Sequence, residues 1–185
     1  MTTTRNKTYD MICVAMFAVI MAVCSWISIP TLVPFTMQTF ALFLAFGVLG
    51  GKRGTLVVVI YVLLGAVGVP VFAGFSSGLG VLMGTTGGYV LGFLLSGLLY
   101  WSLERLLGEK IWVHALSMVL GMVTYYVFGT IWFMVVYTQN TGAIGLSAVL
   151  GWCVFPFLLP DSIKLVLALI LSDRLKKIVK KSGWE

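Results

Sequence analysis

Asp161 and Lys164 are the residues of this chain whose types and spacing could do chemistry inside a membrane. They lie three residues apart in an apolar run with no other charged side chain between Lys110 and Asp173. If this run is helical, both side chains project from one face of the helix. A charged side chain at membrane depth costs about 2.5–3.5 kcal/mol on insertion scales, so it usually faces a cavity or a partner. The pair therefore predicts a polar ligand site or, as the alternative, an ion pair that neutralises itself within a helix bundle.

The composition of the chain predicts an integral membrane protein. Of its 185 residues, 60% are hydrophobic and 10% are charged, and the mean hydropathy is +1.07. A soluble domain of this size needs a larger share of polar side chains on its surface. Three scattered cysteines and one histidine predict neither a disulfide framework nor a metal centre. We expect a single membrane domain over residues 1–185.

Hydropathy predicts six membrane-spanning helices, so the expected fold class is an all-α six-helix bundle. The expected spans are residues 9–29, 36–50, 54–69, 85–103, 111–138 and 157–179. The first span follows Arg5 and Lys7 as a signal peptide would, but it is long for one and lacks a small-x-small cleavage site. Pro156 and Pro160 should interrupt the last apolar stretch. This leaves residues 143–155 as a short segment over the bundle and Pro160 at the start of the last helix.

Basic residues gather on one side of this six-span scheme. They flank the spans at the termini and at two turns: Arg5, Lys7, Lys52, Arg53, Arg105, Lys110, Arg174, Lys176, Lys177, Lys180 and Lys181. The connections on the other side hold no Lys or Arg: residues 30–35, 70–84 and 139–156. The positive-inside rule therefore predicts a multi-pass protein of the cell membrane with both termini in the cytoplasm. Lipid headgroups then account for the formal charge of +6 without nucleic acid. Asp161 lies in the outer half of the bilayer and Lys164 one turn deeper.

Rows of small residues predict close helix packing. The fourth span has a small residue at every fourth position, which gives it one smooth edge: Gly84, Gly88, Gly92 and Ser96. Ala18 and Ala22 form a similar edge on the first span. That edge either packs within the protein or docks another membrane protein, and the sequence leaves both interpretations open.

Enzyme motifs occur only in fragments. Gly74-Phe-Ser-Ser-Gly78 fits the Gly-x-Ser-x-Gly nucleophile pattern. However, Ser76 lies in an outer connection and His114 at the inner end of the fifth span, nearly a bilayer apart and beyond the reach of a general base. Gly51-Lys52 lacks the first glycine and the Ser/Thr of a P-loop. We expect no catalytic site, no metal and no cofactor bound by this chain.

The remaining polar residues favour a small-molecule pocket that opens outwards. They lie at the outer ends of the second, fourth and sixth spans, and residues 68–84 form an uncharged Gly/Ser-rich loop suited to a mobile lid. An apolar wall with a few polar groups is the usual composition of a ligand site, although packing explains the aromatic residues equally well. The candidate substrate-binding residues are Thr36, Gln38, Phe75, Ser76, Tyr89, Asp161 and Lys164.

Four short motifs, taken together, carry a family resemblance. They are Val33-Pro-Phe-Thr-Met-Gln38, Pro70-Val-Phe-Ala-Gly-Phe-Ser-Ser-Gly-Leu-Gly80, Gly84-Thr-Thr-Gly-Gly-Tyr89 and Asp161-x-x-Lys164. Over essentially the whole chain, the sequence resembles the BioY family, the biotin-specific S components of energy-coupling-factor (ECF) vitamin transporters. The chain departs from the family pattern at Thr85, where proline is common, and at Leu159-Pro160-Asp161, where Pro-Gly-Asp is common.

The resemblance implies a six-helix bundle that captures biotin with high affinity from the extracytoplasmic side. It implies as partners a coupling transmembrane subunit and two ABC ATPase subunits that use the ATP, with Ala18-x-x-x-Ala22 similar to the family's docking motif. For biotin we expect Asp161 to accept ureido N–H bonds and Lys164 to bond the ureido oxygen or to steady Asp161. The alternative is a stand-alone secondary carrier that uses these two groups as a proton or ion relay.

Overall fold

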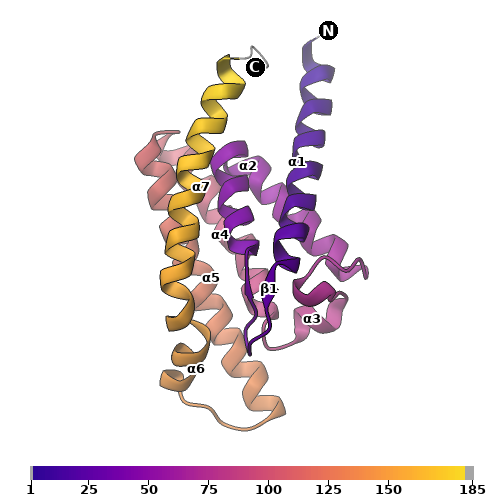
Figure 1. Ribbon diagram of the computed structural model, residues 1–185, viewed down its shortest axis with the longest axis vertical. Helices are drawn as coiled ribbons and strands as arrows, with labels where there is room; N and C mark the ends of the chain where they lie inside the picture. Colours follow the sequence, from indigo (N-terminus) through magenta and orange to yellow (C-terminus); the bar gives the residue numbers. More distant parts are fainter. Residues whose placement is uncertain (1, 182–185) are drawn as a thin grey trace.

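Five long helices build the protein, as the computed structural model shows (Figure 1). It describes the backbone of residues 2–181 and the side chains of residues 7–177. The long helices are α1 (Thr2–Trp26), α2 (Gln38–Ala66), α4 (Gly87–Leu107), α5 (Ile111–Asn140) and α7 (Phe155–Lys181). The short elements are β1 (Ser28–Ile29), β2 (Phe35–Thr36), η1 (Ala73–Phe75), α3 (Leu79–Met83) and α6 (Leu146–Cys153). Each long helix contains a stretch long and apolar enough to cross a membrane, so the protein is a mostly helical multi-pass bundle.

Helix α2 is not one straight rod, because it folds back on itself at Gly50. This residue has φ +78° and ψ 173°, a backbone conformation outside the helical region that glycine adopts at little cost. Two contacts show that the arms run antiparallel: Gly54 packs on Phe46, and Gln38 donates a 2.9 Å hydrogen bond to the Tyr61 hydroxyl. The arms match the predicted spans 36–50 and 54–69, whereas counting continuous helices gives five candidate spans. Six crossings of the membrane therefore stay a prediction.

The start of α1 and the end of α7 lie at the same end of the bundle (Figure 1). The turn from α4 to α5 lies there as well, and so does the Gly50 bend, since Arg53 just after it forms a 2.9 Å ion pair with Asp10 of α1. The connections β1–β2 and α5–α6 lie at the opposite end. The basic residues of the predicted inner side thus share one end of the molecule. The side chains of three of them lie outside the described residues: Arg5, Lys180 and Lys181.

Helices α4 and α5 pack closely, as the row of small residues on the fourth span predicts. A Cβ atom added at Gly88 would lie 2.2 Å from the Cβ of Trp132, and one added at Gly92 would lie 2.9 Å from the Cα of Tyr125. Gly84 precedes α4, and its carbonyl accepts a 3.0 Å hydrogen bond from the Trp132 indole. This close approach brings the aromatic side chains of α5 beside the start of α4.

Pro160 lies inside α7 rather than at its start, so that prediction is wrong. Helix α6 ends at Cys153, Val154 leaves the helical conformation with φ −123° and ψ −60°, and α7 begins at Phe155. Pro156 thus occupies the first turn, where a missing N–H removes no helical hydrogen bond. Asp161 consequently lies in the second turn of α7. The short segment predicted over the bundle at residues 143–155 is present as α6.

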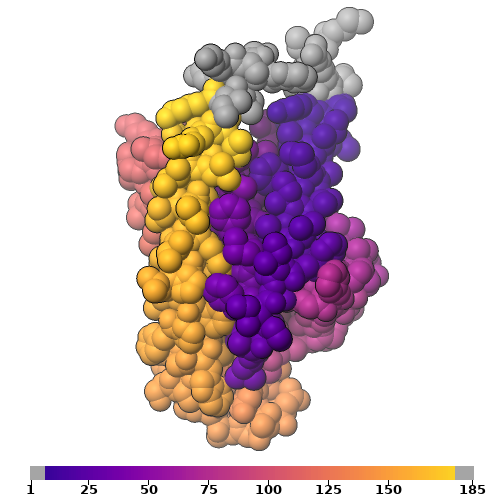
Figure 2. Space-filling view, viewed as in Figure 1, coloured from indigo at the N-terminus to yellow at the C-terminus, as the bar shows by residue number. Residues whose placement is uncertain are grey.

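The Ala18 and Ala22 edge of α1 faces inward, as the packing interpretation of the sequence expects. That these two alanines dock a partner stays a prediction. Ala18 is 3% exposed and Ala22 is 6% exposed, on the same face of α1 as Val14, Phe17 and Met21. This face packs on α2, which lies between α1 and α7 and shows as a narrow strip in Figure 2. The exposed large side chains of α1 are on another face: Met11, Ile12, Met16, Val19 and Val23.

Candidate functional site

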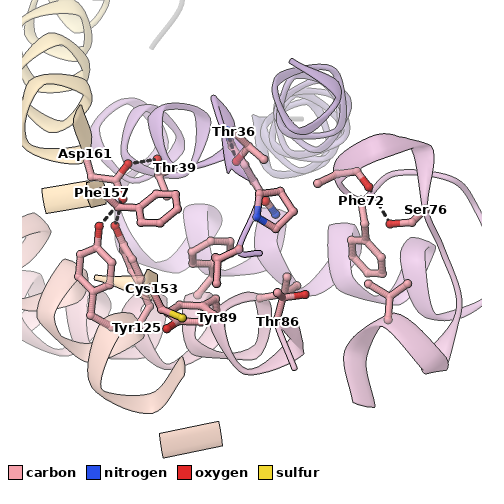
Figure 3. A pocket seen from close by; sticks show the side chains of 18 of the residues that line it. Thr36, Thr39, Phe72, Ser76, Thr86, Tyr89, Tyr125, Cys153, Phe157 and Asp161 are labelled. Atoms are coloured by element: carbon pink, nitrogen blue, oxygen red, sulfur yellow. Dashed lines mark hydrogen bonds between the residues drawn. The ribbon is translucent and has the colours of Figure 1, made fainter. Parts of the chain in front are cut away.

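A cavity of about 120 Å³ lies among these helices, and Figure 3 shows side chains that line it. Its lining comes from β2, the start of α2, the segment that follows α2, the start of α4, the middle of α5, and α6 and α7. Most of the wall is aliphatic or aromatic, and a few polar side chains converge on it. Such a composition is typical of a small-molecule site.

Six of the seven predicted substrate-binding residues line this cavity: Thr36, Gln38, Ser76, Tyr89, Asp161 and Lys164. The structure therefore brings together side chains that lie up to 128 residues apart in the chain. Whether they contact a ligand stays a prediction.

Phe75, the seventh predicted residue, does not line the cavity, and whether it contacts a ligand stays a prediction. Its side chain is 63% exposed and stacks on Trp26, with 4.9 Å between the ring centroids. The backbone of Phe75 has φ +59°, and this turn carries its ring towards α1. Phe72, three residues earlier, lines the cavity in its place.

Asp161 is buried, and every acceptor site of its carboxylate is used (Figure 3). Thr39 and Lys164 donate hydrogen bonds of 2.9 and 2.8 Å to Oδ1. The hydroxyls of Tyr125 and Tyr126 donate bonds of 2.9 and 2.7 Å to Oδ2. An ionised carboxylate has about four lone-pair sites, and four donors fill them. These bonds compensate the cost of removing the charge from water.

Lys164 is buried as well, and its three N–H donors all have acceptors. Its ammonium group bonds Oδ1 of Asp161 at 2.8 Å, the Thr39 hydroxyl at 3.2 Å and the backbone carbonyl of Thr36 at 2.7 Å. The Nζ atom also lies 4.1 Å from the centroid of the Phe35 ring, a cation–π contact. Asp161 and Lys164 therefore neutralise each other, as one sequence interpretation predicts, and both line the cavity. That they form a ligand site stays a prediction.

Thr39, Tyr125 and Tyr126 are the polar cavity residues that the sequence reasoning missed. Two adjacent tyrosines in the middle of an apolar span were the available signal, because a hydroxyl in hydrocarbon needs a hydrogen-bond partner. Asp161 and Lys164 are the charged residues of the sequence at that depth. The sequence could thus have predicted that the hydroxyls of the two tyrosines form hydrogen bonds with this charged pair.

The predicted separation of Ser76 and His114 is confirmed. Ser76 lies at the first cavity and donates a 2.8 Å hydrogen bond to the carbonyl of Ala73. His114 lines a second cavity of about 140 Å³. There its Nδ1 lies 2.5 Å from the Tyr100 hydroxyl and its Nε2 lies 3.3 Å from Nζ of Lys176. The two residues lie in different cavities, and each has its own partners.

Cys153 lines the first cavity, and its thiol can report on the surroundings there. Burial raises the pKa of this thiol to about 11. Only the thiolate reacts with maleimides, and its fraction rises tenfold per pH unit below the pKa. In a Cys13→Ala/Cys24→Ala variant we therefore expect N-ethylmaleimide to alkylate Cys153 about tenfold faster at pH about 9.5 than at about 8.5, as measured by mass spectrometry. An ordinary thiol with a pKa of about 8.5 gains about twofold over this range, and a gain that small would contradict the buried environment.

Comparison with known proteins places this architecture in a family. The BioY family model matches residues 1–181. Biotin transporter BioY of Thermotoga maritima is 42% identical over 163 residues, which cover 88% of this chain and 92% of that protein. Probable biotin transporter BioY of Pyrococcus horikoshii is 35% identical over 171 residues, covering 92% and 98% of the two chains. The fold is similar to a crystal structure of the S-component for biotin from an ECF-type ABC transporter, with a TM-score of 0.81 and 24% identity over 96% of this chain and 95% of that chain. The chain therefore belongs to the BioY family.

Proposed function

We propose that this chain captures biotin with high affinity from the extracytoplasmic side and delivers it across the membrane as the substrate-binding subunit of an ECF-type ABC transporter. The cavity carries the proposal, because it combines apolar walls with one buried charged cluster in a protein whose relatives are named biotin transporters. Biotin has matching chemistry: a polar ureido ring beside an apolar thiophane ring and valeryl tail. The proposed partners are a coupling transmembrane subunit and two ATPase subunits, since the P-loop pattern is incomplete at Gly51-Lys52.

The proposal sets six helical segments across the membrane, with the cavity facing outwards and both termini in the cytoplasm. Two observations support this orientation. The two arms of α2 run antiparallel, as the arms of a segment that crosses the membrane twice must. Basic residues lie at the end of the bundle that holds the termini, which the positive-inside rule assigns to the cytoplasm.

Biotin must exchange hydrogen bonds with the charged cluster rather than add to it. Asp161 and Lys164 have no spare acceptor or donor. A ureido N–H that bonds Asp161 therefore displaces one of its present donors, such as the Thr39 hydroxyl. Exchange of one hydrogen bond for another contributes little net free energy. Affinity then comes mainly from burial of the apolar ring and tail, at about 25 cal/mol per Å².

Titration of the purified protein with biotin tests the proposal. Two tryptophans form hydrogen bonds with segments that border the cavity. The indole N–H of Trp26 donates to the carbonyl of Pro70 at 2.8 Å, and the indole N–H of Trp132 donates to the carbonyl of Gly84 at 3.0 Å. We expect a saturable change in tryptophan fluorescence at about one biotin per chain, since one cavity holds the charged cluster. Valeric acid, which lacks the ureido and thiophane rings, is the control and should give no such change. Failure of biotin to bind would overturn the proposal.

The stand-alone carrier is not favoured. A relay needs an ionisable group that is free to exchange a proton or an ion, whereas Asp161 and Lys164 satisfy each other and their neighbours. Cells that lack the ATPase partners separate the two functions. We expect biotin uptake to stop in such cells, and a secondary carrier would sustain it.

A further inference from the structure

The connection between α2 and α4 exposes large apolar side chains. It lies in a stretch, residues 54–103, that contains no charged side chain. On α3, Leu79 is 57% exposed and Met83 is 69% exposed. Other large side chains of the connection are exposed as well: Val67, Val69 and Phe75. A connection that runs through water usually carries polar side chains, and a group of exposed apolar ones marks an interaction surface.

Helix α3 does not lie beyond the end of the bundle. The carbonyl of Gly84, directly after α3, accepts a 3.0 Å hydrogen bond from the indole of Trp132 in α5. Trp132 precedes the end of α5 at Asn140 by eight residues, which is about 12 Å along the helix axis. Figure 1 likewise shows α5 and α6 continuing past α3, away from the termini. The end of α3 is therefore level with the apolar part of α5 rather than with its polar end, Thr138-Gln-Asn140.

The surroundings at this level are indicated by α5 itself. Ile131 and Val135, on either side of Trp132, are large, apolar and exposed, and they belong to a helix long and apolar enough to cross a membrane. Exposed side chains at that level of such a helix meet acyl chains rather than water. Figures 1 and 2 show α3 and its neighbours, in magenta, at the side of the bundle. The exposed side chains of α3 therefore face the same surroundings as those of α5.

The backbone of the connection is hydrogen-bonded as a segment in lipid must be. Irregular backbone at membrane depth has no water to bond, so its C=O groups require donors from the protein. Side chains of the long helices supply such donors to three carbonyls of the connection: Trp26 to Pro70 at 2.8 Å, Tyr61 to Val71 at 2.9 Å and Trp132 to Gly84 at 3.0 Å. In a connection surrounded by water, water would satisfy these carbonyls.

We propose that residues 67–84 form a re-entrant segment that lies in the lipid of one leaflet, with Leu79 and Met83 in contact with acyl chains. The orientation proposed above makes this the outer leaflet. Phe72, Ala73 and Ser76 of the same segment line the first cavity. One wall of that cavity is thus held between the helix bundle and the membrane, and this holds whichever ligand the cavity takes.

Site-directed spin labelling tests the proposal. Leu79→Cys and Met83→Cys, each in a Cys13→Ala/Cys24→Ala/Cys153→Ala background, carry a nitroxide, and the full chain is reconstituted alone in phosphatidylcholine vesicles. Oxygen concentrates in hydrocarbon, whereas nickel ethylenediaminediacetate is polar and stays in water. We expect oxygen to reach both labels, and the nickel complex to reach them at least about tenfold less than a label in water, since a polar group is costly to transfer into hydrocarbon. Both positions are exposed, so the cysteines leave the packing intact.

Ile131→Cys and Gln139→Cys are the matched controls on α5, because Ile131 is exposed in its apolar part and Gln139 is exposed at its polar end. Labels at Leu79 and Met83 should match the label at Ile131. If they match the label at Gln139 instead, α3 lies in water and the proposal is overturned. If neither reagent reaches them, protein rather than lipid covers α3, and the proposal is overturned as well. The experiment uses no biotin, so its result is independent of the proposed function.

Discussion

Lys164→Met is expected to destabilise the unliganded protein by about 3–5 kcal/mol, because it leaves the Asp161 carboxylate buried without its counter-ion. The carboxylate would keep its bonds from Thr39, Tyr125 and Tyr126, but these are neutral donors. The variant also loses the bond from Lys164 to the carbonyl of Thr36, which connects α7 to β2. We therefore expect biotin binding to be lost together with stability. Thermal unfolding in detergent and biotin titration measure the two effects.

The same substitution at Lys177 is the matched control on the same helix. Lys177 pairs with Asp173, but its side chain is 74% exposed and that of Asp173 is 43% exposed. An exposed pair of this kind contributes about 0.3–0.5 kcal/mol, so Lys177→Met should have little effect. The double variant Asp161→Asn/Lys164→Met removes both buried charges and should recover much of the lost stability. If Lys164→Met costs no more than Lys177→Met, the buried pair does not stabilise the site.

Gly88→Ala is expected to destabilise the protein by about 1–3 kcal/mol or more through overpacking. The new methyl group would lie 2.2 Å from the Cβ of Trp132, which is closer than carbon atoms approach without a bond. Helix α4 would have to move away from α5, and the start of α4 carries Tyr89 into the cavity wall. We therefore expect a lower Tm and weaker biotin binding in the same variant.

Gly151→Ala provides the control for this glycine substitution. Gly151 is also helical, in α6, and nothing lies within 4 Å of the position that its Cβ would take. Alanine in place of an unhindered helical glycine stabilises a protein by about 0.5–1 kcal/mol. The two Gly→Ala variants should therefore change the Tm in opposite directions, and equal effects would contradict close packing of α4 on α5.

The long apolar helices were predictable, because a helix must be long to cross the hydrocarbon core of a membrane. In lipid, the backbone N–H and C=O groups have few other ways to form hydrogen bonds. The Gly-rich basic turn after Leu49 predicted the bend of α2, because a charged turn separates two apolar stretches. The start of α7 was not predictable from proline alone. Pro160 removes a bond only to the carbonyl of Pro156 in the first turn, which is a small loss compared with that in a helix interior.

The charged half of the site was predictable, and its partners were not. Asp161 and Lys164 stand out because charges are rare in hydrocarbon. Thr39 and Tyr126 reach Asp161 across 122 and 35 residues of chain, and such contacts depend on how helices pack rather than on local sequence. The positive φ of Phe75 has no sequence signal either, because non-glycine residues seldom adopt it.

Helix α7 carries both buried charges, and it follows all of their partners in the chain. Proteins are synthesised from the N-terminus, so a ribosome completes the partner residues before it reaches α7: Thr36, Thr39, Tyr125 and Tyr126. An unpaired charge would be costly to transfer into lipid, but here it meets donors and acceptors that earlier segments already hold in the bilayer. The cavity is therefore complete only after α7, which carries the two charges, has been inserted.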